Sequence, residues 1–161
     1  MNLKRLVYIV SEIDKSLHFE WVCPLLQRNF DFSIILIGKR GTEIERFLTS
    51  RGIRLTVLSY AGKRDLVRIW CQVFMAIMRV RPQIVHTHLW IANLTGLTAA
   101  WLAGVERRIY TRHHATIHHE KYPSGLKWDG LSNRLATDII AITENVQRIL
   151  LEMDKANAKK I

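Results

Sequence analysis

The sequence predicts an α/β fold: a doubly wound, mainly parallel, six-stranded sheet with helices on both faces, in a single domain over residues 1–161. Six short apolar runs alternate with helical patterns along the chain. Such alternation implies right-handed crossovers between parallel strands. The 161 residues have room for one domain with a substantial core, and 48% of them are hydrophobic, so disorder is not expected.

The first expected strand, Leu6 to Val10, is a continuous apolar run, as in parallel sheets that are covered on both faces. The six expected strands lie at residues 6–10, 32–37, 53–58, 84–88, 108–111 and 138–142. Helices are expected between them, the first with its apolar pattern at Trp21, Val22, Leu25 and Leu26, and others at about residues 42–50, 65–79, 91–103 and 126–136, with a last one from residue 143.

Local signals refine these helices. Pro24 should kink the first helix or make it restart. Thr42 and Glu45 have the spacing of a capping box, and Asp65 is the expected N-cap of the next helix. Small residues in helix 91–103 would let it lie close against the sheet. The polar stretch 112–125 is interpreted as a loop, longer than the usual connection of about 2–6 residues.

The net charge of the chain limits the kinds of binding partner that are expected. Lys and Arg outnumber Asp and Glu by 24 to 14, which gives a formal charge of +10. This excess favours phosphorylated small molecules or anionic lipid surfaces. The sequence has no zinc-finger spacing, no RNP-like pattern and no long basic run, so no nucleic-acid partner is expected.

The cysteines and the apolar helices indicate where in the cell the protein is located. Cys23 and Cys71 lie in apolar helical stretches and are expected to be reduced core residues.

The helix at 65–79 is apolar on more than one side, which core packing and a neighbouring helix explain best. Alternatively, Trp70, Phe74 and Met75 could touch an anionic membrane. Every apolar run is far shorter than the roughly 20 residues of a membrane span, so a cytoplasmic location is expected, with peripheral contact at the inner membrane face as an option.

Histidine pairs follow two neighbouring expected strands. His86 and His88 end one strand, and His113 and His114 follow the next. Both pairs should therefore lie at the carboxyl edge of the sheet, where open α/β sheets bind ligands. His86 is interpreted as a buried imidazole bonded to neighbouring backbone. His113 and His114 begin the long loop and could donate to a ligand hydroxyl or phosphate.

A metal site is the competing interpretation of these histidines, because His-x-His is a common ligand pair. The carboxylates nearest in the sequence are Glu120 and Asp138. His114 and His118 have helical spacing but fall in the expected loop. No metal is therefore expected.

The first expected βα loop, Ser11 to Ser16, contains no glycine. Dinucleotide sites of Rossmann-like domains need G-x-G-x-x-G there, so NAD-type binding is disfavoured and no cofactor is expected. The helix that follows still offers free amides to a phosphate. Other basic residues, Lys39–Arg40, Lys63–Arg64 and Arg112, follow strands and should lie at the same edge.

Four segments, in this order, resemble a known family: Ile84–His88, the helix ending at Ala103–Val105, Thr111-x-His113, and Asp138–Val146. Together they are similar to the N-terminal domain of family 4-like glycosyltransferases with the GT-B fold. That family implies two Rossmann-like domains around a cleft. The N-terminal domain chiefly binds the acceptor, and the C-terminal domain holds the nucleotide-sugar.

The resemblance also implies site residues. His113 matches the histidine that reaches the transferred sugar, and His114 is the second candidate because the histidine is doubled. Residues Asp14, Lys15 and Ser16 of the first loop would approach the donor phosphates, although relatives often have a glycine pair there. Two strand-end residues, His88 and Arg112, complete the expected substrate-binding set.

The expected function is that of the acceptor-binding domain of a retaining glycosyltransferase, acting without a metal. It would transfer a sugar from a nucleotide-sugar to a glycan or glycolipid in cell-surface polysaccharide or lipopolysaccharide biosynthesis. The donor-binding domain is not in this chain, which alone should be inactive. The alternative is a non-catalytic Rossmann-like module that binds a protein or a membrane, and a histidine metalloenzyme is a third interpretation.

Overall fold

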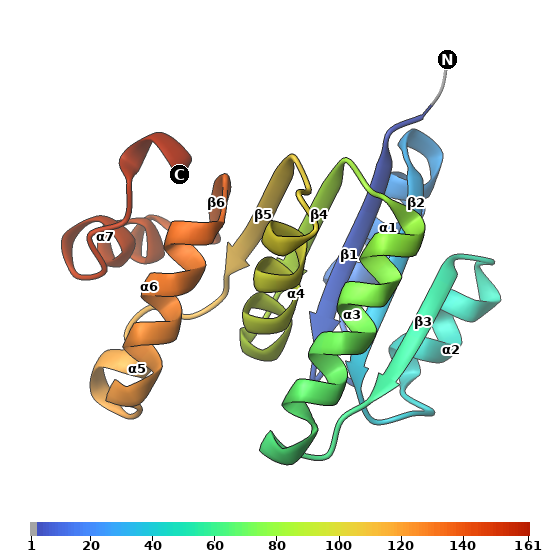
Figure 1. Cartoon of the computed structure of the whole chain (residues 1–161), viewed down its shortest axis with the longest axis horizontal. Helices are drawn as coiled ribbons and strands as arrows, with labels where there is room; N and C mark the ends of the chain where they lie inside the picture. The colour runs from blue at the N-terminus through green and yellow to red at the C-terminus, as the bar shows by residue number, and fades with distance from the viewer. Residues whose placement is uncertain (1–2) are drawn as a thin grey trace.

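The computed structural model describes residues 3–161, and within them a six-stranded sheet forms in which all neighbouring strands are parallel (Figure 1). The strands are β1 (Arg5–Ser11), β2 (Asp31–Gly38), β3 (Arg54–Ser59), β4 (Ile84–His88), β5 (Arg107–Arg112) and β6 (Asp138–Ala141). Their order is β3-β2-β1-β4-β5-β6, which confirms the doubly wound fold. Met1 and Asn2, the first residues of the expected domain, lie outside the described residues.

Helices cover both faces of the sheet (Figure 1). They are α1 (Leu17–Asn29), α2 (Glu43–Ser50), α3 (Leu66–Val80), α4 (Trp90–Leu102), α5 (Ile117–Glu120), α6 (Leu126–Leu135) and α7 (Glu144–Glu152). Short 3₁₀ turns cover Lys63–Asp65, Pro123–Gly125 and Ala158–Lys160. One buried cluster joins β1 and β2 to α1 and α2, and another joins the opposite face to α3 and α4. Among the described residues, no helix is long and apolar enough to cross a membrane.

The expected N-cap of α2 is confirmed, and the expected N-cap of α3 is not. The Oγ1 atom of Thr42 accepts a hydrogen bond from the amide of Glu45 at 3.2 Å, as expected. The carboxylate of Asp65 does not cap α3. It accepts from the Ala61 amide at 2.8 Å and pairs with Arg68 at 2.9 Å, because a 3₁₀ turn precedes the helix and turns this side chain back toward the loop.

Helix α1 runs without interruption through Pro24, so the expected restart is wrong. Proline removes one amide donor, which leaves the carbonyl of Glu20 without its usual partner. Both residues are only partly buried, so water can hydrate that carbonyl and the helix continues. Cys23, next to the proline, is buried as expected.

Helix α3 separates its apolar residues between core and surface. The rings of Trp70 and Phe74 stack with centroids 5.4 Å apart and pack against the core. The indole of Trp70 also donates to Thr98 of α4 at 2.9 Å. These two aromatic residues therefore join α3 to the core and to α4, and their expected contact with lipid stays a prediction. Met75 is exposed, and so is Cys71, which is not the core residue that the sequence suggested.

Helix α4 lies close against the sheet because of one glycine. A Cβ atom on Gly96 would lie 2.7 Å from Thr87 and 2.9 Å from Ile9. Both distances are too short for a side chain at this position. The expectation that small residues allow close packing here is confirmed, and the N-terminal end of α4 is held firmly beside the carboxyl ends of β1 and β4.

Candidate functional site

The two histidine pairs meet at the carboxyl edge of the sheet. The register of the parallel strands places His88 beside Thr111, and His113 follows just beyond. The Nδ1 atom of His88 lies 3.2 Å from Nε2 of His113. His86 bonds to the Thr111 hydroxyl at 2.8 Å, and not to backbone as expected. The predicted position of both pairs at neighbouring strand ends is confirmed.

Burial keeps the inner pair neutral. Burial, with the nearby His113 and His18, lowers the pKa of His86 to about 3. The pKa of His88 is lowered further, first by burial and then by His86. The ring of Tyr8 packs edge-on against His86 with centroids 4.7 Å apart. These imidazoles are therefore uncharged at neutral pH and form a polar floor under the edge of the sheet.

A cavity of about 680 Å³ opens beside this floor, a size typical of small-molecule sites. It lies over the ends of β1, β4 and β5. Residues from all three strand ends and from the segment after β5 line it, including Ser11, Leu89, Trp90, Arg112, His113, His114, His118 and Trp128. Two buried nitrogen atoms on this lining, Nε1 of Trp90 and Nδ1 of His114, make no hydrogen bond within residues 3–161. Unpaired buried polar atoms are rare, so these two indicate a place where a ligand binds.

Strained backbone accompanies the cavity. Leu89, between β4 and α4, has φ 71° and ψ 165°, a region that favours glycine. Glu12, at the end of β1, has φ 53°. Both residues line the cavity, and residues held in such conformations cost of order 1–3 kcal/mol and gather at functional sites. The strain at Leu89 also directs the amino end of α4, with its positive dipole, toward the carboxyl edge.

Arg112 lies at the centre of a buried ionic network. Its guanidinium is 2% exposed and pairs with Asp129 at 2.7 Å and with Asp154 at 3.1 Å. Each carboxylate also holds an imidazole, since His118 lies 2.6 Å from Asp129 and His119 lies 2.7 Å from Asp154. The donors of Arg112 that face these groups are occupied, and its expected contact with substrate stays a prediction.

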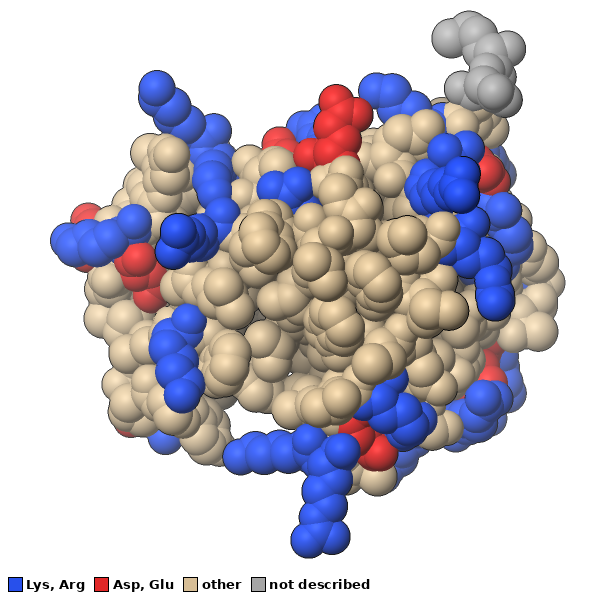
Figure 2. Space-filling view, viewed as in Figure 1, with Lys and Arg blue, Asp and Glu red and all other residues tan. Residues whose placement is uncertain are grey.

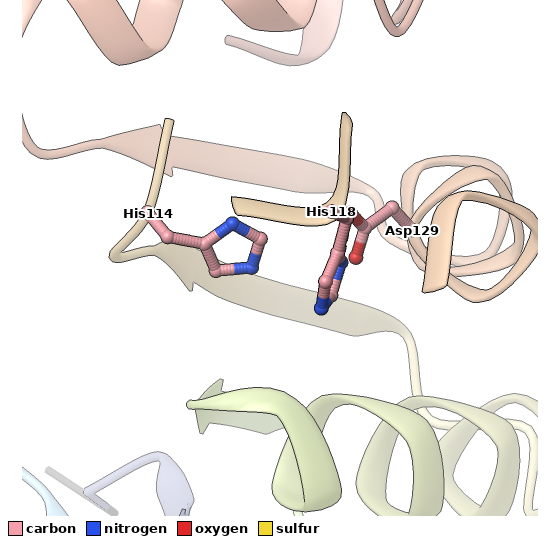
Figure 3. Close-up of side chains that lie close together, drawn as sticks. All are labelled: His114, His118 and Asp129. Atoms are coloured by element: carbon pink, nitrogen blue, oxygen red, sulfur yellow. Dashed lines mark hydrogen bonds and ion pairs between the residues drawn. The ribbon is translucent and has the colours of Figure 1, made fainter. Parts of the chain in front are cut away.

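His114, His118 and Asp129 come together beside the cavity (Figure 3). One potential ligand atom of each residue lies within 4.8 Å of those of the other two. Burial, followed by the charge of Arg112, lowers the pKa of His114 to about 4, so its imidazole is neutral at pH 7. The sequence did not reveal this group. The stretch interpreted as a loop contains α5, which carries His118, and the carboxylate comes from α6, eleven residues further on.

The first loop is tied to α2. Asp14 accepts from the amide of Glu43 at 3.3 Å, and Lys15 pairs with the Glu43 carboxylate at 2.9 Å. This hydrogen bond raises the pKa of Lys15. Ser16 is the N-cap residue of α1 but makes no side-chain capping bond. The predicted contacts of these loop residues with donor phosphates stay predictions.

A second hollow, of about 650 Å³, lies at the ends of β2 and β3. Basic side chains gather on its lining, where Lys39, Arg40 and Lys63 lie near Asp14. Lys63 also lines the histidine cavity. The prediction that these basic residues occupy the carboxyl edge is confirmed.

Fold and cavity together define a glycosyltransferase-type α/β domain of the GT-B kind. The family model of Glycosyltransferase Family 4 matches residues 22–161, and the chain belongs to this family as an N-terminal domain. No curated protein matches the sequence.

Solved structures share the fold at low sequence identity. The UDP-N-acetylglucosamine 2-epimerase from Rickettsia bellii matches with a TM-score of 0.78 and 13% identity, over 99% of this chain and 44% of that chain. Anabaena Alr3699/HepE, in complex with UDP and glucose, matches with a TM-score of 0.75 and 15% identity, over 99% and 43%. The lipopolysaccharide outer core galactosyltransferase WaaB matches with a TM-score of 0.72 and 12% identity, over 98% and 44%. The chain thus spans less than half the length of these proteins.

Proposed function

We propose that this chain is the acceptor-binding domain of a retaining glycosyltransferase. The enzyme would transfer a sugar from a nucleotide-sugar to a glycan or glycolipid, in cell-surface polysaccharide or lipopolysaccharide biosynthesis in the cytoplasm. The observation that carries the proposal is a family 4 sequence match combined with a histidine-lined cavity at the carboxyl edge. A second domain would hold the donor and close the cavity, and this domain alone would be inactive.

His113 is suited to positioning a sugar hydroxyl. Its Nε2 atom already faces Nδ1 of His88 at 3.2 Å, so its Nδ1 atom is free for a ligand. Burial, with the nearby His18, lowers the pKa of His113, and the neutral ring has one donor and one acceptor nitrogen. If His88 donates to Nε2, then Nδ1 of His113 carries the proton and donates to the substrate. His88 would thus act as a positioning residue.

Glycosyl transfer separates positive from negative charge, and this domain has groups that can stabilise the negative charge and orient the sugar. Breaking a sugar–phosphate bond leaves positive charge on the sugar and negative charge on the diphosphate. Helix amino ends and basic side chains stabilise the diphosphate without moving a proton. A fixed imidazole that orients the sugar lowers the barrier by several kcal/mol through positioning. One structural neighbour was solved with UDP and glucose, which supports uridine nucleotides as the first donors to test.

The test uses the complete gene product that contains this chain, with a panel of nucleotide-sugars and lipid-linked acceptors. We expect His113→Ala to lower kcat by about 10²-fold, as removal of one fixed donor does, and His113→Gln to restore part of it. Glu106→Ala, an exposed change at the opposite edge of the sheet, is the matched control. Transfer by His113→Ala at the wild-type rate would refute this assignment. Binding without turnover of any donor would favour the non-catalytic module.

A second proposal is peripheral contact with an anionic membrane. The face over α3 and α4 is broad and uncharged, and Lys and Arg side chains, with fewer Asp and Glu side chains, lie around it (Figure 2). Large apolar side chains are exposed on these two helices, namely Val67, Met75, Met78, Trp101 and Leu102. An apolar surface with a basic rim suits the interface of an anionic bilayer.

Vesicle sedimentation tests the membrane contact. We expect binding to phosphatidylglycerol vesicles and little to phosphatidylcholine vesicles. The double variant Met75→Glu with Trp101→Glu should weaken binding by about tenfold or more, because two apolar contacts are lost. Trp21→Glu, at an equally exposed site on the opposite face of the sheet, is the control. Equal binding to both lipids, or equal loss in the control, would contradict the proposal.

A further inference from the structure

His114, His118 and Asp129 have the composition of a transition-metal site. Two imidazoles and one carboxylate, with an open position, resemble the ligand sets of catalytic zinc ions. Nitrogen-rich sets select Zn²⁺ and its neighbours in the periodic table over Mg²⁺ and Ca²⁺, which prefer oxygen. The three potential ligand atoms lie within 4.8 Å of one another. Tetrahedral zinc needs separations of about 3.3 Å, so the ligand atoms would have to move closer together when an ion binds.

Each of the three side chains offers a ligand atom. Neither ring nitrogen of His114 makes a hydrogen bond within residues 3–161, although its Nδ1 atom is buried. Nδ1 of His118 lies 2.6 Å from Oδ2 of Asp129, so an ion bound by both residues would replace this hydrogen bond. Asp129 also holds Arg112 through Oδ2, which leaves Oδ1.

Local charge favours a cation at this point. Beside the three residues, the single guanidinium of Arg112 faces two buried carboxylates, those of Asp129 and Asp154. When the imidazoles are neutral, the buried groups carry one negative charge in excess. Paired or metal-bound buried charges are the stable arrangements. His114 and His118 both line the cavity, so an ion and a ligand bound to it have access from solvent.

One glycine maintains the position of His118. A Cβ atom on Gly125 would lie 2.7 Å from Cγ and 2.9 Å from Nδ1 of the His118 ring. The backbone at Gly125 has φ −73°, which any residue can adopt. Glycine is therefore required here by the close approach of the imidazole and not by its conformation.

We propose that His114, His118 and Asp129 bind one divalent ion of the Zn²⁺ class, with a further coordination position open to the cavity. The proposal is independent of glycosyl transfer, because it concerns a metal ion and needs no donor sugar. It also assigns a use to a carboxylate that the sequence did not connect with the histidines.

The test is metal titration of the 161-residue chain, without an affinity tag and after treatment with a chelator. We expect one Zn²⁺ per chain by calorimetry, and Co²⁺ to give the visible absorption of a four- or five-coordinate ion. His114→Ala is the most informative variant, because this side chain makes no hydrogen bond whose loss could unfold the protein. It and His118→Ala should each weaken binding by about 10²-fold or more. His18→Ala, an exposed histidine outside the group, should leave the affinity unchanged.

Two results would overturn the proposal. One is the absence of stoichiometric binding of Zn²⁺ and Co²⁺ by the folded wild-type chain. The other is binding of equal affinity in His114→Ala and His118→Ala, with folding of both variants verified by circular dichroism. Loss of binding in His18→Ala alone would place the ion at the other histidine cluster and would equally refute this site.

Discussion

Replacement of Arg112 by methionine should destabilise the protein strongly. The change keeps an unbranched side chain of similar length and removes the charge. Asp129 and Asp154 are only 6% and 4% exposed and would lose their cationic partner. Removing one partner of a buried ion pair costs about 3–5 kcal/mol, because the remaining charge stays buried and unpaired. For a chain of this size, each kcal/mol lowers Tm by about 2–4 °C, so we expect a fall of roughly 6–20 °C.

Urea unfolding followed by circular dichroism measures this effect. Arg54→Met is the matched control, because Arg54 also pairs with an aspartate, Asp31, but is 60% exposed. Exposed pairs contribute about 0–1 kcal/mol, so the control should lose little stability. An Arg112→Met variant within about 1 kcal/mol of wild type would refute the reasoning. It would also restore Arg112 as a candidate for contact with substrate.

A rescue experiment separates charge from packing. Adding Asp129→Asn and Asp154→Asn to Arg112→Met removes the unpaired carboxylates as well. Replacing all members of a buried ionic group is often nearly neutral, so the triple variant should be more stable than Arg112→Met alone. A triple variant of still lower stability would show that the guanidinium acts mainly through its packing.

Three further predictions concern buried rings and glycines. Below about pH 6.5 the unfolded chain protonates His86, whereas the folded chain keeps it neutral down to about pH 3. Stability should therefore fall by about 1.4 kcal/mol per pH unit on acidification, and His86→Leu should reduce this slope in urea unfolding. Gly96→Ala should cost about 1–3 kcal/mol through overpacking, and an unchanged thermal midpoint would contradict the close contact of α4. Gly125→Ala should displace His118, seen as a shift of its imidazole NMR resonances and a weaker affinity for Zn²⁺, with no change expected for His86.

The fold was predictable because a buried parallel strand leaves a simple pattern. β1 and β2 contain the short continuous apolar runs Leu6–Val10 and Ile34–Ile37, and each is recognisable without its neighbours. Errors arose where local rules compete. Asp65 is a good capping residue, yet Arg68 and the Ala61 amide hold its carboxylate elsewhere. Cys71 lies in a largely apolar stretch, but helical periodicity turns it to the surface of α3.

Only those parts of the candidate site that the register of the sheet positions were predictable from the sequence. Parallel register places His88 and His113 together, and this follows from the order of strands. The partners of Arg112 do not follow, because Asp154 lies 42 residues away on the chain beyond α7. Buried charges find partners through tertiary packing, and no local spacing marks them. The buried residues of α6 are Asp129, Ser132 and Asn133, so no apolar pattern distinguishes its inner side in the sequence.

The two hollows at the carboxyl edge differ in the polar and charged side chains that line them. Neutral imidazoles such as His113 face the first cavity, and the guanidinium of Arg112 on its wall is held by two carboxylates. The second hollow is lined by Lys39, Arg40 and Lys63, together with Glu12 and Asp14. Phosphate oxygens gain more from cationic donors, whereas sugar hydroxyls match neutral imidazoles. Under the proposed function, the acceptor would place a phosphate at Lys63, which lines both hollows, and its sugar beside His113. The excess of basic residues would then act at one end of the acceptor, and the histidines at the other.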